Sequence, residues 1–287
     1  MNLEVQHSAS AQGALFGWLV SYPKSGNTWM RMMLQSLRKG GAAVDINEPI
    51  DSHTLHREEF EEHFGVESSD LTEAEIDAVR PELHRAIARS AKVPLILRKV
   101  HDHCWLTTSG ERVFPPEVSR GAVYIARDPR DVAVSFAAFY GMDLKSAVGY
   151  LGDSHRRPAK SSSRLIPQLS QPVGNWSEHV VSWLDDAAMP VLLIRYEDML
   201  ADSALELAKV ARFLGLPEEA CAQAAASSSF STLREQEDEQ GFRERIPAAT
   251  RFFRQGRSGE GKEKLAVHLR ERIEAEHGAV MNRLGYL

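Results

Sequence analysis

The sequence predicts an α/β fold in which a largely parallel sheet is flanked by helices. Short apolar runs of strand length alternate along the chain with segments whose apolar residues recur at helical spacing. This alternation is typical of a parallel sheet covered by helices. No internal repeat or second domain is visible, and 287 residues are enough for one large domain with a substantial core. We therefore expect a single domain over residues 1–287.

A loop with the character of a phosphate-binding site follows the first predicted strand, residues 15–20, and residues 22–29 read YPKSGNTW. Apolar residues then share one helical face: Trp29, Met30, Met33, Leu34 and Leu37. The N-terminus of a helix favours an anion, and Lys24 adds a full charge there. Lys24 precedes Gly26, whereas in the nucleoside-triphosphate P-loop the Lys follows the second Gly. A plain strand–turn–helix connection with a solvated Lys is the alternative.

A second strand-to-helix junction carries residues suited to another phosphate. The apolar run 121–126 leads into Arg127, and residues 128–129 are an Asp and a Pro that can cap and start a helix. Ser135 lies two turns into that helix, so its hydroxyl and the Arg127 guanidinium can converge on one phosphate. A surface ion pair of Arg127 with Asp131 is the alternative.

Two more strand candidates, residues 94–99 and 190–196, end in polar side chains. Ligands of open parallel sheets bind beyond the carboxyl ends of the strands. We therefore expect four side chains to face one crevice: Lys24, Lys99, Arg127 and Tyr196. Residues 203–214 predict an amphipathic helix that stops at Gly215, and the charged, helical segment 58–89 is expected to cap the substrate side or to cover the sheet.

The two phosphate-binding segments together resemble the donor site of a known enzyme family. Residues 22–29 resemble the 5′-phosphosulfate loop of the cytosolic-type sulfotransferases, whose motif reads YPKSGTTW, and Asn27 is the one departure. Residues 124–135 resemble the 3′-phosphate motif of that family, with Arg127 and Ser135 at the family's separation. Further matches follow in the family's chain order: 98–101, 195–199, 228–230 and 252–256. The resemblance extends from about residue 15 to the C-terminus.

The resemblance implies transfer of a sulfuryl group from 3′-phosphoadenosine 5′-phosphosulfate (PAPS) to a hydroxyl, less readily an amine, of a small-molecule or natural-product acceptor. It implies adenosine 3′,5′-bisphosphate (PAP) as the product and no metal. Lys24 would stabilise the departing 5′-phosphate oxygen, Lys99 the developing sulfuryl charge, and His101 would be the general base. His103 is a rival base two residues on, and solvated surface cations are the alternative for both lysines.

The remaining donor-binding roles are also carried over from the family. Four residues would cradle the 5′-phosphate: Ser25, Gly26, Asn27 and Thr28. Five would hold the 3′-phosphate: Arg127, Ser135, Arg254, Gln255 and Gly256. Contacts with adenine or ribose, with packing roles left open, are expected from Trp29, Tyr196, Ser228 and Phe230. The last motif departs from the family's RKGxxGDWK, because Gln255 replaces the Lys and the Trp is absent, and whether Arg257 substitutes for that Lys stays open.

Two segments, 144–174 and 232–250, are expected to be mobile surface loops, and residues 1–12 to be disordered. The first is rich in Gly, Pro and Ser, and the second is rich in acidic residues. The functional alternative for both is a lid that excludes water from the donor. A basic cluster in the first segment hints at an acceptor with negative charge: Arg156, Arg157, Lys160 and Arg164.

The composition favours a cytoplasmic protein. A net charge of −6 argues against non-specific binding to nucleic acid, and the two cysteines form neither a CxxC motif nor a zinc ligand set. Residues 1–12 lack the features of a signal peptide, and no stretch approaches the ~18 apolar residues of a membrane span. We expect no nucleic-acid and no membrane partner. Residues 262–271 partly resemble the family's dimerisation segment, with Ala266 where Thr is usual, which leaves a homodimer open.

Two other classes of function stay open at this point. A small-molecule kinase of related architecture would need the glycine spacing of the nucleoside-triphosphate P-loop, which residues 22–29 do not have. A non-catalytic PAP-binding protein would have no use for His101 and Lys99 beside the transfer point. The acceptor is not identified, although Trp105, Phe139 and Tyr140 are candidates for an aromatic wall.

Overall fold

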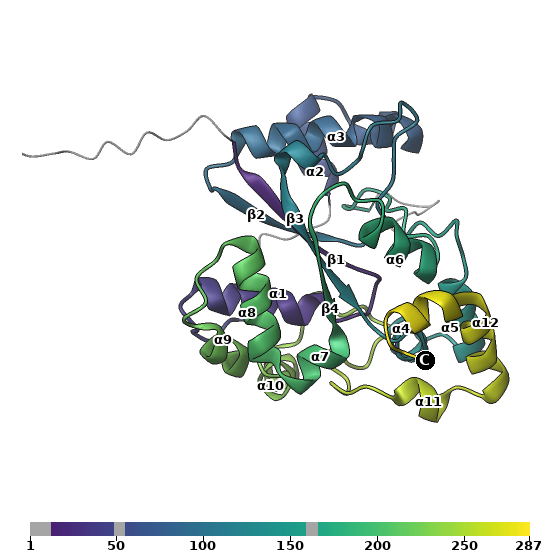
Figure 1. Ribbon diagram of the computed structural model, residues 1–287. Coiled ribbons are helices and arrows are strands. Elements are labelled where there is room, and N and C mark those ends of the chain that lie inside the picture. Colours follow the sequence, from purple (N-terminus) through teal and green to yellow (C-terminus); the bar gives the residue numbers. More distant parts are fainter. Residues whose placement is uncertain (1–12, 49–54, 159–165) are drawn as a thin grey trace, which may run out of the picture.

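The computed structural model describes residues 13–48, 55–158 and 166–287. Its centre is a sheet of four parallel strands in the order β2-β1-β3-β4 (Figure 1), which confirms the predicted fold class. The strands are β1 (Leu15–Ser21), β2 (Leu95–Val100), β3 (Ser119–Ala126) and β4 (Val191–Arg195). The last pairs of each ladder bring the carboxyl ends of all strands to one edge: Val20–Val100, Ser21–Ile125 and Ala126–Arg195.

Helices cover both faces of the sheet (Figure 1). Those before β3 are α1 (Asn27–Arg38), α2 (Arg57–Phe64) and α3 (Glu73–Ser90), with the short 3-10 turns η1 (Ser68–Asp70) and η2 (Pro116–Val118). Between β3 and β4 lie α4 (Pro129–Tyr140), α5 (Leu144–Leu151) and α6 (Trp176–Leu184). The rest are α7 (Tyr196–Ala201), α8 (Ser203–Leu214), α9 (Cys221–Ser227), α10 (Phe230–Gln240), α11 (Glu260–Lys264) and α12 (Val267–Arg283).

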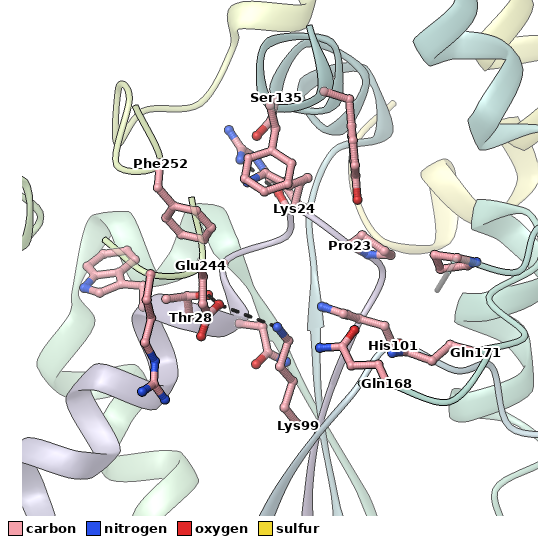
Figure 2. A pocket seen from close by; sticks show the side chains of 18 of the residues that line it. Pro23, Lys24, Thr28, Lys99, His101, Ser135, Gln168, Gln171, Glu244 and Phe252 are labelled. Atoms are coloured by element: carbon pink, nitrogen blue, oxygen red, sulfur yellow. Dashed lines mark hydrogen bonds and ion pairs between the residues drawn. The ribbon is translucent and has the colours of Figure 1, made fainter. Parts of the chain in front are cut away.

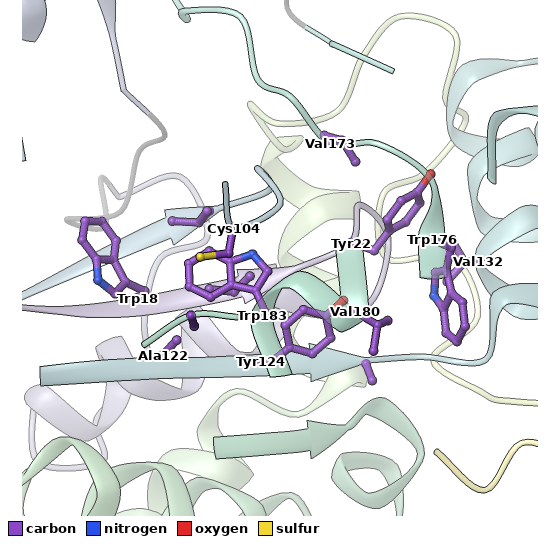
Figure 3. Packing of buried hydrophobic residues seen from close by; sticks show 14 of the residues in the cluster. Trp18, Tyr22, Cys104, Ala122, Tyr124, Val132, Val173, Trp176, Val180 and Trp183 are labelled. Carbon is purple, nitrogen blue, oxygen red and sulfur yellow. The ribbon is translucent and has the colours of Figure 1, made fainter. Parts of the chain in front are cut away.

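Alternate residues of the central strands enter two separate cores, because successive side chains of a strand point to opposite faces. Leu19 belongs to the core shared with α1, α8 and α9. Its neighbour Trp18 belongs to the core shared with α3, α6 and α12. Figure 3 shows this second core, in which Tyr22, Tyr124 and Trp183 belong to the same cluster as Trp18. Strands buried on both faces read as continuous apolar runs, which is why the sequence revealed them.

Local capping signals set the start and end of the helices that matter for the site. Asp128 accepts a hydrogen bond from the N–H of Arg130 and Pro129 occupies the first turn of α4, as the sequence predicted. Gly215 ends α8 with a φ of 71°, a left-handed conformation that glycine adopts without strain. These local signals explain why the predicted start of α4 and the predicted bounds of α8 agree with the structure.

The prediction of loops over 144–174 and 232–250 is wrong for the first part of each segment. Residues 144–151 form α5, because Asp143 caps its N-terminus and three apolar side chains turn inward: Ala147, Val148 and Leu151. Residues 230–240 form α10, in which Leu233 and Glu237 are buried although the surrounding residues are acidic. Residues 159–165 and the segment 1–12, which was predicted to be disordered, lie outside the described residues. The mobility of 144–174 and 232–250 stays a prediction.

Within the three described ranges, none of the helices has the length and apolar character that crossing a bilayer requires.

Candidate active site

A cavity of about 800 Å³ opens at the carboxyl edge of the sheet. Most of the residues that were predicted to bind the donor or to take part in the reaction line this cavity: Lys24, Gly26, Asn27, Thr28, Trp29, Lys99, His101, Arg127, Ser135, Tyr196 and Phe230. The structure therefore brings the two predicted phosphate segments and the predicted base to one pocket. Five predicted residues do not line it: Ser25, Ser228, Arg254, Gln255 and Gly256.

The loop after β1 is built for close approach of a ligand to the backbone. Gly26 has a φ of 102°, and a Cβ atom there would lie 2.6 Å from the ring of Tyr196, so only glycine fits. The Asn27 side chain donates a hydrogen bond from Nδ2 to the carbonyl of Leu19 at 2.8 Å, which ties the loop back to the strand. The hydroxyl of Ser25 is buried and has no hydrogen-bond partner among the described residues. An oxyanion seated in the loop would supply that partner.

Lys24 is a half-buried cation inside the pocket and not a solvated surface lysine. Its Nζ lies 3.8 Å from the ring centroid of Phe139 and 4.3 Å from that of Phe252. Burial lowers the pKa of Lys24 to about 7, and repulsion from Arg127 and Lys99 adds to the shift. At neutral pH such a group is only partly charged, and an anion that comes to lie beside it favours the charged form.

Glu244, which sequence reasoning missed, lies between the second cation and the loop. Its carboxylate lies 3.7 Å from Nζ of Lys99 and accepts a hydrogen bond from the hydroxyl of Thr28 at 3.4 Å (Figure 2). It also lies 2.5 Å from Nη2 of Arg31. Burial lowers the pKa of Lys99, whereas the contact with Glu244 raises it. The acidic run at residues 235–239 had indicated a solvated loop over 232–250 and carried no signal for this contact.

The geometry of His101 leaves one ring nitrogen free to accept a proton. Its Nδ1 lies 2.7 Å from the carbonyl oxygen of Ser21. Because a carbonyl can only accept, Nδ1 carries the proton and Nε2 keeps its lone pair. Burial, with Lys99 as the next cause, holds the pKa of His101 well below its usual value. The imidazole is therefore neutral at physiological pH and able to act as a base.

The rival histidine, His103, does not line the pocket. Its main-chain N–H donates to the carbonyl of Pro172 at 2.9 Å, and its Nδ1 is buried without a hydrogen-bond partner among the described residues. Of the two candidates, only His101 has a ring at the cavity wall.

Buried polar contacts fix the main chain around His101. The Trp183 indole donates to the carbonyl of Asp102 at 2.9 Å, and the ring of His179 lies 3.1 Å from the carbonyl of His101. The Asp102 carboxylate accepts from Nη2 of Arg80 at 2.7 Å, and both side chains are almost fully buried. These contacts hold the segment after β2 in the position that presents the imidazole to the cavity.

Replacing Asp102 by Ala is expected to lower the free energy of unfolding by about 3–5 kcal/mol, because it leaves the buried Arg80 guanidinium without its close partner. Urea unfolding followed by circular dichroism measures this change. The matched control is Asp185→Ala, which removes an exposed partner of Arg283 and should cost under about 1 kcal/mol. An equal loss in the free energy of unfolding for the two variants would show that the pair of Arg80 and Asp102 does not hold the segment after β2.

Arg127 and Ser135 line the pocket as predicted. The guanidinium lies 4.2 Å from the ring centroid of Tyr196 and donates to the carbonyl oxygens of Lys24 and Arg257, each at 3.2 Å. The alternative, an ion pair with Asp131, is not formed between these two described residues. Asp131 instead accepts from the N–H groups of Gly259 and Gly261 at 2.8 and 2.6 Å.

Ion pairs hold the arginines in and beside the last motif. Arg254 donates to Glu260 at 2.9 Å and Arg257 to Glu263 at 2.9 Å, so both guanidinium groups are occupied by carboxylates. The Ser228 hydroxyl faces the core and donates to the carbonyl of Met32 at 3.3 Å, while the Ser228 carbonyl accepts from the indole of Trp29 at 2.9 Å. A role for Arg254, Gln255 or Gly256 at the 3′-phosphate therefore stays a prediction.

The rest of the cavity wall combines Arg156, from the basic cluster that the sequence singled out, with residues for which the sequence carried no specific signal. The expected aromatic wall is present in part, since Phe139 and Tyr140 line the cavity whereas Trp105 does not. Further lining residues are His56, Arg156, Pro158, Ile166, Pro167, Gln168 and Gln171. In the described part of the chain, no three side chains of His, Cys, Asp or Glu gather in a way that could hold a metal ion.

Comparisons with known proteins agree with the geometry. The family model described as sulfotransferase domain matches residues 17–285. The chain is similar to sulfotransferase 1A1 of Canis lupus familiaris, with 26% identity over 275 residues that cover 92% of this chain and 83% of the relative. It is 28% identical to sulfotransferase 1A1 of Rattus norvegicus over 272 residues, which cover 91% of this chain and 82% of the relative.

Solved structures share the fold. A retinol dehydratase in complex with androsterone and the inactive cofactor PAP superposes with a TM-score of 0.56 at 19% identity, covering 93% of this chain and 80% of that one. The mouse sulfotransferase SULT7A1, complexed with PAP, superposes with a TM-score of 0.54 at 20% identity, covering 93% and 85%.

Proposed function

This chain belongs to the sulfotransferase family, and we propose that it transfers a sulfuryl group from PAPS to a hydroxyl group of a small-molecule acceptor. The observation that carries the proposal is a single pocket lined by Lys24, Arg127 with Ser135, and His101. PAPS has two phosphate-containing ends, which would match the two phosphate segments. The structural relatives that were solved with PAP support the same donor.

The residues of the loop fit a phosphosulfate group. The buried hydroxyl of Ser25 lacks a partner among the described residues, and Gly26 lies so close to Tyr196 that the loop has no space for a side chain. We propose that backbone N–H groups of residues 25–28 hold the 5′-phosphate and that Lys24 lies beside it. Arg127 and Ser135 would hold the 3′-phosphate, next to the Tyr196 and Trp29 rings that line the same cavity.

The chemistry proposed is an in-line displacement at sulfur. The acceptor oxygen forms a bond to sulfur while the bond between sulfur and the 5′-phosphate oxygen breaks. The acceptor proton passes to Nε2 of His101, and the electron pair of the broken bond stays on the phosphate oxygen beside Lys24. Lys99 would stabilise the charge on the transferred group, which requires Lys99 to exchange its 3.7 Å contact with Glu244 for the sulfuryl oxygens.

Calorimetry and labelled sulfate transfer together test the proposal. PAP is expected to bind more tightly than ATP–Mg²⁺, and enzyme with labelled PAPS is expected to transfer sulfate to members of a panel of phenols, alcohols and amines. Preference for ATP–Mg²⁺ would indicate a kinase. PAP binding with neither transfer of sulfate to any acceptor nor release of sulfate to water would indicate a non-catalytic binding protein.

Two further predictions from the sequence accompany the proposal. A cytoplasmic location stays a prediction. The segment expected at a dimer contact, residues 262–271, spans the junction of α11 and α12, where Val267 is 59% exposed. A homodimer also stays a prediction, and sedimentation analysis of the wild-type chain measures it.

A further inference from the structure

Arg156 is a buried cation at the pocket wall, and none of the described carboxylates pairs with it. The residue is 7% exposed and lines the cavity. Its guanidinium donates to the hydroxyl of Tyr22 at 3.2 Å and lies 4.2 Å from the ring centroid of Phe136 and 4.9 Å from that of Tyr150. In the described part of the chain, no carboxylate forms an ion pair with it.

The next residue, Arg157, forms the ion pairs with carboxylates that are usual for a structural arginine. Its guanidinium lies 2.8 Å from the carboxylate of Asp77 and 3.5 Å from that of Glu73, and it does not line the cavity. A buried guanidinium is costly unless it is paired, so the missing partner of Arg156 is the unusual feature. Rings on its faces provide part of the compensation, but they supply no acceptor for its remaining N–H groups.

The position of Arg156 is fixed before any ligand binds. Its carbonyl accepts from the N–H groups of Val173 and Gly174 at 2.9 and 3.2 Å, and its own N–H donates to the carbonyl of Asp153 at 3.4 Å. Together with the aromatic rings around the guanidinium, these bonds restrict the side chain to one region of the wall. An anion that arrives there meets a preorganised charge.

Arg156 belongs to the acceptor side of the cavity. The chain just after Arg156 is hydrogen-bonded to the chain at Gln171, because the Gln171 N–H donates to the Pro158 carbonyl at 3.2 Å. Figure 2 places Gln171 and Gln168 beside His101, on the side of the pocket away from Phe252. The two donor phosphates are already matched by the loop after β1 and by Arg127 with Ser135, so they leave Arg156 without an assigned anion.

We propose that Arg156 recognises an anionic oxygen group, a carboxylate or a phosphate, which the acceptor carries in addition to the hydroxyl that receives the sulfuryl group. This inference rests on the proposed function. A charged partner in the cavity would satisfy the free N–H groups of the guanidinium and offset its burial. It would also orient the acceptor hydroxyl relative to His101.

Matched acceptors test the proposal. Hydroxyphenyl- and hydroxyalkyl-carboxylic acids, the corresponding phosphate monoesters and the corresponding neutral amides are compared with labelled PAPS as donor. For the wild-type enzyme, kcat/KM is expected to be about tenfold or more higher for one anionic set than for the amides. The set that is preferred, carboxylate or phosphate, identifies the anion.

Variants assign the preference to one side chain. Arg156→Gln should remove the preference, Arg156→Lys should retain part of it, and the matched control Arg157→Gln should leave it unchanged. PAP affinity, measured by calorimetry, should be unchanged in all three. A loss of PAP affinity in Arg156→Gln would assign the guanidinium to the donor and overturn the proposal.

The outcomes separate this inference from the proposed function. Absence of PAP binding and of any transfer contradicts the proposed function itself. PAP binding with equal use of acids, phosphates and amides, or with use of the amides alone, overturns the role of Arg156 and leaves the proposed function standing. The comparison of acceptors in the wild-type enzyme decides this point even if Arg156→Gln does not fold.

Discussion

Replacing His101 by Ala is expected to lower kcat for sulfate transfer by ~10²–10⁴-fold, with PAP affinity within about twofold of wild type. The reason is geometric, since Nδ1 is bound to the Ser21 carbonyl and only Nε2 can take the acceptor proton. Rates with the best acceptor of the panel and calorimetry with PAP measure the two quantities. Retained transfer in this variant would show that the base lies elsewhere.

The matched control is His103→Ala, which removes the nearby imidazole that does not line the cavity. Its kcat is expected to stay close to wild type, and a loss confined to this variant would make His103 the base. The pH profile gives a second check. Because the pKa of His101 is held well below its usual value, kcat/KM should not fall through protonation of this residue as the pH drops from 7 to ~6.

Replacing Lys24 by Met is expected to lower kcat by ~10²–10³-fold, comparable to the loss of a preorganised oxyanion donor. Methionine keeps an unbranched apolar stem between the rings of Phe139 and Phe252, so packing is preserved while the charge beside the leaving phosphate is lost. The control is Lys92→Met, which removes an exposed lysine next to the amino end of β2. A smaller loss in Lys24→Met than in this control would contradict the assignment.

Lys24 also predicts a pH dependence of donor binding. In the free protein its pKa is about 7, and a phosphate beside it favours the charged form and raises that pKa. Above pH 7, PAP binding must therefore take up a proton, and affinity should fall by up to about tenfold per pH unit between pH 7 and ~9. Calorimetry in buffers of different ionisation enthalpy detects this proton, and Lys24→Met should abolish it.

Features set by local sequence could be predicted. Continuous apolar runs revealed the strands because the sheet is buried on both faces, and Asp128 with Pro129 marked the start of α4. The loop after β1 was recognised from the same kind of local signal. Its one departure, Asn27, has a structural reason, because its side chain bonds the carbonyl of Leu19.

Features set by tertiary packing could not be predicted. Residues 235–239 are polar and mostly acidic, which indicated a loop, yet Leu233 and Glu237 lie one turn apart on the buried face of α10. Glu237 accepts from the N–H groups of Phe252 and Phe253 at 2.7 and 2.8 Å, a contact that no local pattern reveals. The place of Glu244 in the site depends on an irregular segment that other parts of the chain position. The same holds for which arginine of the predicted basic cluster lines the cavity, since Arg156 does and Arg157 does not.

A crystal structure with bound PAP would show directly how the cavity holds the donor. We expect one PAP molecule that spans the cavity, with its 5′-phosphate on residues 24–28 and its 3′-phosphate on Arg127 and Ser135. We also expect Nε2 of His101 to face the space next to the 5′-phosphate. A PAP molecule that reaches only one of these segments, or that binds outside the cavity, would contradict it.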